Sequence, residues 1–183
     1  MTRIIAGIHK GRRLAVPDGT QVRPTTDRMR ERLFSMLMHS RYPDINGAFV
    51  ADIFAGTGAL GLESLSRGAT HTTFVEKSPG PLATLKNNIS LLKVENQTDI
   101  LQTSARALPP ARRPYDFIFM DPPYRMGLAE PALASLLENG WLAPNGVIIC
   151  ELATDDDTCF PPELELVDER TQGQQRMVFL KQS

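Results

Sequence analysis

With 183 residues, the chain has the length of one domain, and its 42% of apolar residues suffices for a buried core. The net charge is −1. The chain has only two cysteines, without metal-ligand spacing, which argues against a disulfide-rich scaffold or a structural metal site. No apolar stretch approaches the length of a membrane span or a signal-peptide core, so we expect a cytoplasmic protein with no membrane partner and no metal.

Positive charge is concentrated at the beginning of the chain. Residues 1–41 contain nine Lys or Arg residues and three acids, whereas the remainder contains 11 basic and 18 acidic residues. A basic end on an acidic body favours a polyanion partner over a merely solvated surface. We predict a basic extension over residues 1–25 and a main domain over 26–183. The predicted RNA-binding residues are Arg3, Lys10, Arg12, Arg13, Arg23 and Arg28, and phosphate contacts are expected from Lys10, Arg12 and Arg13. The arginines at the start of the first helix could instead contact a cofactor or pair with Glu31 and Asp27.

The first helix is expected directly after the basic extension. Thr26 or Asp27 can cap it, because a short oxygen-bearing side chain can accept hydrogen bonds from the first free amides. Apolar residues then recur at helical spacing and predict a buried stripe, namely Met29, Leu33, Met36 and Leu37. The helix is expected to end near Ser40.

A glycine-rich loop between a strand and a helix dominates the next stretch. Residues 49–54 read as a buried strand, residues 55–61 match Gly-x-Gly-x-x-Gly, and residues 62–67 are predicted to be helical. Glu76 ends the next strand, residues 71–76, where its carboxylate can accept hydrogen bonds from ribose hydroxyls. Because the glycines follow a strand, precede a helix and are joined to this acid, the pattern predicts a nucleoside-bearing cofactor.

The glycine pattern alone fits both NAD and S-adenosylmethionine. Two further features favour S-adenosylmethionine: Asp52 can face an ammonium group, and an amine-binding motif follows later in the same sheet. Residues 103–105 are expected near the adenine ring. The predicted cofactor-binding residues are Asp52, Phe54, Ala55, Gly56, Gly58, Leu60, Glu76, Lys77, Ser104, Ala105 and Asp121.

The rest of the chain alternates predicted strands and helices. Strands are expected at 98–102, 117–120 and 147–151, helices at 79–92 and 128–137, and a turn at 141–146. Two last strands, 164–169 and 176–180, are joined by a short connection and should pair antiparallel. The pattern predicts an α/β fold. No unpartnered apolar stripe is evident, so we expect a monomer.

The candidate catalytic residues are Asp121, Pro122, Pro123 and Tyr124, which follow a buried strand. Ligands of open α/β sheets bind at the carboxyl ends of strands. The prolines fix the turn and lack N–H groups, so Asp121 and the Pro122 carbonyl can both accept hydrogen bonds from an –NH2 group. Tyr124 offers a flat face for a base. A packed proline-rich turn is the alternative interpretation.

Taken together, these motifs resemble a known family. Residues 52–58 and 121–124 are similar to those of Rossmann-type amino-methyltransferases that use S-adenosylmethionine. Residues 3–7, 11–14 and 23–34 narrow the resemblance to the RsmD-like 16S rRNA (guanine-N2)-methyltransferases. The resemblance runs from about residue 3 to residue 151. Near the last strand the family often has a Gly-Asp-Thr turn, where this chain has Gly173-Gln174-Gln175.

The resemblance implies a fold, an activity and a partner. The fold is a Rossmann-like sheet of seven strands with the last strand antiparallel, helices on both faces and a small basic N-terminal extension. The implied substrate is the N2 amine of one guanine in 16S rRNA of the small ribosomal subunit or its assembly intermediate. The alternatives left open are an N6-adenine DNA methyltransferase, a protein-glutamine methyltransferase, an NAD-dependent oxidoreductase and a silent RNA-binding module.

Overall fold

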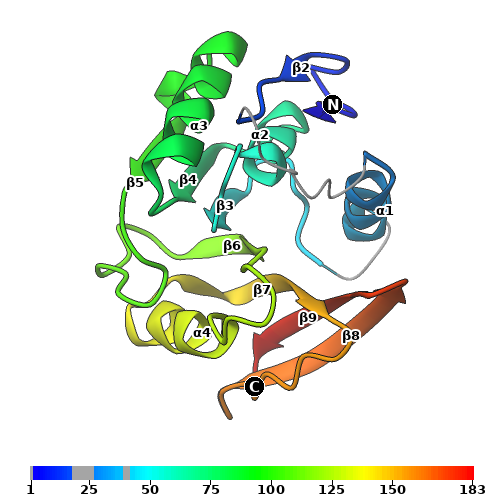
Figure 1. Cartoon of the computed structure of the whole chain (residues 1–183), viewed down its shortest axis with the longest axis vertical. Helices are drawn as coiled ribbons and strands as arrows, with labels where there is room; N and C mark the ends of the chain where they lie inside the picture. Colours follow the sequence, from blue (N-terminus) through cyan, green and yellow to red (C-terminus); the bar gives the residue numbers. More distant parts are fainter. Residues whose placement is uncertain (1, 18–26, 39–41) are drawn as a thin grey trace.

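The computed structural model describes residues 2–17, 27–38 and 42–183 of the chain. Within these ranges, seven strands form one sheet in the order β5-β4-β3-β6-β7-β9-β8 (Figure 1). The strands of this sheet are β3 (Phe49–Ile53), β4 (His71–Val75), β5 (Thr98–Leu101), β6 (Tyr115–Met120), β7 (Leu142–Ala153), β8 (Leu164–Gln172) and β9 (Gln175–Gln182). The helices are α1 (Asp27–Met38), α2 (Ala59–Ser66), α3 (Pro79–Leu92), α4 (Ala129–Glu138) and the 3-10 turn η1 (Glu95–Gln97).

The direction of the strands divides the sheet into two parts. Strands β5, β4, β3, β6 and β7 pair in parallel, so their carboxyl ends share one edge. The last strand, β9, runs antiparallel to both of its neighbours, β7 and β8. This arrangement confirms the predicted seven-stranded sheet with its last strand antiparallel.

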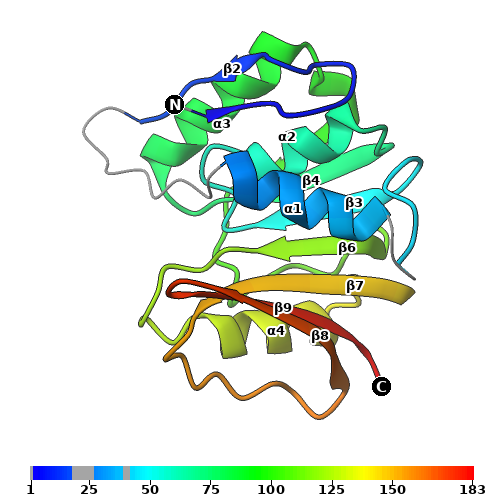
Figure 2. The same ribbon diagram turned by 90° about the vertical axis from the view of Figure 1, so that its right-hand side faces the viewer.

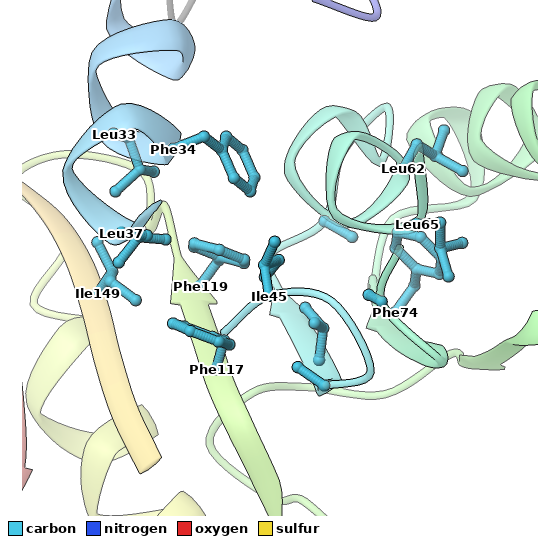
Figure 3. Packing of buried hydrophobic residues seen from close by; sticks show 14 of the residues in the cluster. Leu33, Phe34, Leu37, Ile45, Leu62, Leu65, Phe74, Phe117, Phe119 and Ile149 are labelled. Carbon is cyan, nitrogen blue, oxygen red and sulfur yellow. The ribbon is translucent and has the colours of Figure 1, made fainter. Parts of the chain in front are cut away.

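Helices cover both faces of the sheet, which explains the nearly unbroken apolar sequence of the central strands. Phe117 and Phe119 of β6 face α1, whereas Ile118 and Met120 face α4. Figure 3 shows Leu33, Phe34 and Leu37 of α1 directed at the first of these faces. Three residues of the stripe expected on this helix, Met29, Leu33 and Leu37, are therefore core, whereas Met36 is only partly buried.

Two sequence-based boundaries are wrong. The second helix begins at Ala59, so Gly61 lies inside α2 and not in the preceding loop. A Cβ atom at Gly61 would lie 2.4 Å from the Phe74 ring, so this glycine allows close packing of helix on sheet. The turn expected at 141–146 is also largely strand, because β7 already pairs with Tyr115 of β6 at Leu142.

The basic N-terminal segment forms a small antiparallel ribbon, in which β1 (Thr2–Arg3) pairs with β2 (Arg13–Leu14). The ribbon lies against α2 and α3 (Figure 2). Glu63 of α2, which is fully buried, accepts hydrogen bonds from the Ile5 and Ala6 amides at 2.7 and 3.0 Å. As a segment with too few apolar residues for its own core, it is fixed by buried polar side chains of the main domain.

Asn88 of α3 attaches the end of the ribbon to the glycine loop. Its side chain accepts a hydrogen bond from the Ala15 amide at 2.7 Å and donates to the Ala15 carbonyl at 3.1 Å. The same amide nitrogen donates to the Thr57 carbonyl at 3.0 Å. A single buried side chain therefore contacts both the basic extension and the loop that follows β3.

Some predictions fall on residues outside the described ranges. These are Arg23 as an RNA-binding residue, Thr26 as a helix cap, the helix end near Ser40 and the domain boundary between residues 25 and 26. Within the described ranges, the helices are all too short or too polar to cross a membrane. The same ranges contain no cluster of three or more His, Cys, Asp or Glu residues suited to a metal ion.

Candidate active site

A cavity of about 670 Å³ opens where the parallel strands end. This volume lies within the usual range for sites that bind small molecules and cofactors. The cavity combines residues that follow β3, β4, β5 and β6. Its walls are formed by Phe54, Gly56, Val75, Glu76, Lys77, Ser78, Pro81, Thr103, Ser104, Ala105, Arg106, Asp121, Pro123, Met126 and Leu128.

The glycine loop turns away from the sheet at a residue with unusual backbone geometry. Phe54 has a φ of 63°, in the left-handed region that non-glycine residues rarely adopt. Gly56 follows with a φ of 55°, and the nearest atom to a Cβ built on it is 3.9 Å away. The turn therefore leaves open space beside the loop backbone, on the wall of the cavity.

Glu76 joins the two loops that border the cavity. One carboxylate oxygen accepts a hydrogen bond from the Gly56 amide at 3.0 Å, and the other accepts from the Ser78 amide at 2.7 Å. Each oxygen retains acceptor capacity for a further donor. A vicinal diol, as in ribose, has the two donors that such a fixed carboxylate can bind.

Three predicted cofactor residues shape the loop without lining the cavity, namely Ala55, Gly58 and Leu60. Gly58 has a φ of 78° and precedes α2, and a Cβ atom there would lie 2.4 Å from the Leu85 side chain. This glycine is therefore required by helix packing as well as by the turn. The sequence pattern predicted a turn between β3 and a helix, but it did not separate cavity-lining positions from packing positions.

Asp52 also lies behind the cavity wall. It is buried at the end of β3, where Oδ2 accepts a hydrogen bond from the Gly61 amide at 2.9 Å. Burial raises the pKa of Asp52 to about 8; the Gly61 hydrogen bond opposes the rise, and the negative charges of Asp121 and Glu76 add to it. The structure thus assigns Asp52 one role in orienting α2, and its proximity to the ammonium group of a cofactor stays a prediction.

The proposed catalytic turn lies directly beside this cavity. Asp121 and Pro123 line it, and Pro122 is buried beneath them. Tyr124 is half-buried and points its hydroxyl at β7, donating a hydrogen bond to Glu151 Oε1 at 2.8 Å. Asp121 therefore faces the cavity, whereas the Tyr124 hydroxyl is directed at β7.

Several residues near this site were not identified from the sequence. Ser78, Pro81, Arg106, Met126 and Leu128 line the cavity but belong to no motif. Glu151 was recognised only as the end of a strand. Its position at the carboxyl end of β7, the edge where Glu76 and Asp121 also follow their strands, was the one available signal.

The structure describes five of the six predicted RNA-binding residues. Lys10, Arg12, Arg13 and Arg28 are exposed. Arg3 is exposed too, but its Nε donates to Asp27 Oδ2 at 3.0 Å, which ties the ribbon to α1. The four other cations face solvent and are accessible to a polyanion.

Comparisons with known proteins agree with this architecture. The family model described as "Conserved hypothetical protein 95" matches residues 2–181. "Ribosomal RNA small subunit methyltransferase D" from Haemophilus influenzae is 39% identical over 175 residues, 93% of this chain and 89% of that protein. The Escherichia coli protein of the same name is 39% identical over 173 residues, 94% of this chain and 85% of its own length.

A solved structure extends the similarity to three dimensions. The Escherichia coli methyltransferase yhhF superposes with a TM-score of 0.85 at 36% identity, covering 99% of this chain and 97% of that one. The matching family model, the similar relatives and the shared fold show that the chain belongs to the RsmD-like family of methyltransferases.

Proposed function

We propose that this protein transfers a methyl group from S-adenosylmethionine to the exocyclic N2 amine of one guanine in 16S rRNA. The substrate is the small ribosomal subunit or its assembly intermediate, methylated in the cytoplasm. The observation that carries the proposal is that Asp121 lines the cofactor cavity while belonging to the motif suited to an amine. A methyl donor in the cavity and an –NH2 group at the motif would meet at this carboxylate.

Charge at the glycine loop supports S-adenosylmethionine over a dinucleotide. Glu76 and Asp121 both line the cavity beside the loop, and the charge of each acts on the buried Asp52 behind its wall. The two cavity-lining carboxylates would repel the pyrophosphate that a dinucleotide places at a helix N-terminus. S-adenosylmethionine carries positive charges at its sulfonium and ammonium groups, so the same carboxylates attract it.

The cavity residues fit the parts of this cofactor. The Glu76 carboxylate would hold the ribose hydroxyls, and Ser104 and Ala105 would border the adenine. Lys77 and Ser78 stand at the exposed rim of the same cavity. When bound, S-adenosylmethionine supplies a methyl group already activated by its sulfonium, and the protein has only to position the acceptor and manage its proton.

Asp121 and the Pro122 carbonyl perform that positioning in the proposed mechanism. The lone pair of a guanine amine is conjugated into the ring, which makes the nitrogen a poor nucleophile. Hydrogen bonds from both amine protons to these acceptors favour a pyramidal nitrogen and free the lone pair. Asp121 offsets the positive charge that develops on nitrogen and receives the proton directly or through water. Positioning of this kind can lower a barrier by roughly 7–11 kcal/mol.

Tyr124 and the basic ribbon would select the substrate. Stacking of a base on an aromatic ring is worth about 1–3 kcal/mol. The guanine must leave its own stack, which costs a few kcal/mol and favours single-stranded or loop sites. Lys10, Arg12 and Arg13 would bind the surrounding phosphates with an affinity that falls as salt rises.

Methyl transfer from labelled S-adenosylmethionine tests the proposal. The protein is incubated separately with three acceptors, namely small subunits from cells lacking the endogenous enzyme, naked rRNA, and duplex DNA. Digestion to nucleosides then identifies the methylated base. We expect N2-methylguanosine from the subunits. A matched reaction with the Asp121→Ala variant measures any background from contaminating enzymes.

Other products would replace the proposal with a specific rival. N6-methyladenine in DNA would leave the cofactor and the Asp121 chemistry intact but change the substrate. Label in none of the three acceptors, with S-adenosylhomocysteine still bound, would indicate a protein or small-molecule amine. A thermal shift with NADH and none with S-adenosylhomocysteine would indicate an oxidoreductase.

A further inference from the structure

A second concavity lies between α1 and the hairpin of β8 and β9, outside the cofactor cavity. We name it the α1–hairpin groove. Its volume is about 470 Å³, and it shares no residue with the cofactor cavity. In Figure 2, α1 crosses the sheet above the level of this hairpin. Ten residues line the groove: Met29, Arg32, Leu33, Ser35, Met36, Arg170, Thr171, Gln172, Gln175 and Met177.

The groove adjoins the proposed catalytic turn through two buried or half-buried side chains. Gln175, in the groove wall, donates a hydrogen bond to Glu151 Oε1 at 2.8 Å. The same oxygen accepts the Tyr124 hydroxyl at 2.8 Å. Gln175 also pairs with Ala153, the last residue of β7, so the groove reaches the edge at which the active site opens. The catalytic turn therefore separates the groove from the cofactor cavity.

The lining of the groove suits a nucleotide. Its floor is apolar, because Met29, Leu33 and Met177 are buried. A methionine sulfur makes favourable contacts with aromatic rings, and aliphatic carbon can pack against the face of a base. The exposed guanidiniums of Arg32 and Arg170 flank the floor. Arg170 Nη1 pairs with Asp168, and the remaining N–H groups of both guanidiniums can contact phosphate.

Amide groups complete the rim. Arg32 Nη1 donates a hydrogen bond to Gln172 Oε1 at 2.7 Å, which fixes α1 to the hairpin tip. The Gln172 amide nitrogen can still donate to the edge of a base. The volume corresponds to a small-molecule site and is too small for a partner helix.

We propose that the α1–hairpin groove binds a nucleotide adjacent to the target guanine in single-stranded substrate RNA. The inference rests on the function proposed above and extends it to the recognition of the flanking sequence. A guanine placed at Asp121 and stacked on Tyr124 continues into a chain whose next nucleotide must pass the Glu151–Gln175 side of the turn. The groove lies there, with an apolar floor for its base and cations for its phosphate.

Steady-state kinetics test the groove with two variants and two matched controls. Arg32→Glu reverses a rim charge, and Ser35→Trp fills the groove from an exposed position on α1. Arg113→Glu reverses a charge near Phe49, at the opposite edge of the sheet, and Ser90→Trp adds the same bulk on exposed α3. We expect both groove variants to raise KM for small subunits by on the order of tenfold, with S-adenosylhomocysteine affinity unchanged. The controls should match the wild type.

A photo-cross-link tests the occupant directly. Ser35 replaced by benzoylphenylalanine should cross-link to 16S rRNA within a few nucleotides of the methylated guanine. A cross-link to a second copy of the chain, to a ribosomal protein or to a distant rRNA segment overturns the inference. If KM is unchanged in both groove variants while the wild type methylates the subunits normally, the inference about the groove is overturned and the proposed function stands. Subunits left unmethylated by the wild type overturn the proposed function as well.

Discussion

The hydroxyl of Tyr124 and the carboxylate of Glu151 form a 2.8 Å hydrogen bond that joins the catalytic turn to β7. Glu151 is only 6% exposed, so its geometry is fixed by the sheet. The bond holds one end of the tyrosine ring, whose other end is fixed by the backbone of the turn. A ring held at both ends offers a base a stacking surface that needs no reordering on binding.

Removing this bond should lower turnover without affecting the cofactor. We expect Glu151→Leu to reduce kcat about 10- to 100-fold, because the ring loses its orientation relative to Asp121. Tyr124→Phe should produce a similar loss, and the double variant should lose little more, since both changes remove one interaction. Glu151→Gln keeps an acceptor oxygen and should retain most activity. Fully additive losses in the double variant would refute this role.

Asp121 should be required for chemistry but not for binding S-adenosylhomocysteine, which lacks the sulfonium charge that this carboxylate would attract. We expect Asp121→Ala to lower kcat by about 10²–10³-fold, because the developing charge on nitrogen loses its partner. Calorimetric titration with S-adenosylhomocysteine should give nearly wild-type affinity. The exposed acid Asp157 provides the control, and Asp157→Ala should leave kcat unchanged. Near wild-type turnover of the Asp121 variant would contradict the mechanism.

Asp52 should make the free energy of unfolding fall as pH rises. Its pKa is about 8 in the folded protein, well above the ordinary value of 3.8. Between these values the folded state holds a proton that the unfolded chain has released, so stability is highest at the acidic end and is lost as pH rises toward 8. Asp52 can lower the free energy of unfolding by at most about 1.4 kcal/mol for each unit of rising pH.

Urea unfolding at pH 5.5, 6.5 and 7.5 would measure this slope. Asp52→Asn provides the comparison, because its side-chain oxygen can still accept the Gly61 hydrogen bond but does not titrate. We expect the stability of the wild type to decrease relative to the variant across this series. Parallel pH profiles for the two proteins would show that folding does not change the protonation of Asp52, and hence that its pKa is not raised in the folded protein.

Docking of the basic ribbon can be tested with a matched pair of glycines. Gly7 and Gly11 have φ values of 80° and 83°, but a Cβ atom at Gly7 would lie 1.7 Å from the Ser66 carbonyl oxygen, whereas Gly11 has no atom within 4 Å. Both alanine variants should be destabilised by about 1–2 kcal/mol, because alanine would have to adopt a left-handed backbone conformation at either position. Gly7→Ala should lose roughly 1–3 kcal/mol more through overpacking. Hydrogen exchange should rise across residues 2–16 in Gly7→Ala alone, and equal effects would exclude the predicted clash.

The arginines of the ribbon should account for part of the salt dependence of RNA binding. Arg12 and Arg13 are exposed, and replacing both by Ala should lower the slope of log Kd against log salt by about one per lost phosphate contact. The variant Arg112→Ala/Arg113→Ala removes the same charge from a loop outside the ribbon. An unchanged slope in the Arg12→Ala/Arg13→Ala variant would exclude these residues from the interface.

Local patterns in the sequence predicted most of the elements and the catalytic turn. Central strands of a parallel sheet are buried on both faces, so runs such as residues 117–120 are apolar without interruption. The glycine loop and Glu76 were found because the chemistry of a nucleoside cofactor imposes a fixed spacing. Gly61 was wrongly assigned to the loop, because the sequence alone does not distinguish a glycine required for close packing from one required for a turn.

The sequence by itself therefore predicted where along the chain the chemistry lies: a proposed cofactor loop after the first strand of the sheet and a proposed amine-binding turn after the fourth. Only the tertiary structure decided which side chains support that chemistry. Glu63, Asn88 and Glu151 act through partners 58, 73 and 27 residues away, and the α1–hairpin groove joins elements from opposite ends of the chain. Such contacts depend on how the sheet and helices pack. A local pattern of residues does not show which residues far apart in the sequence will meet.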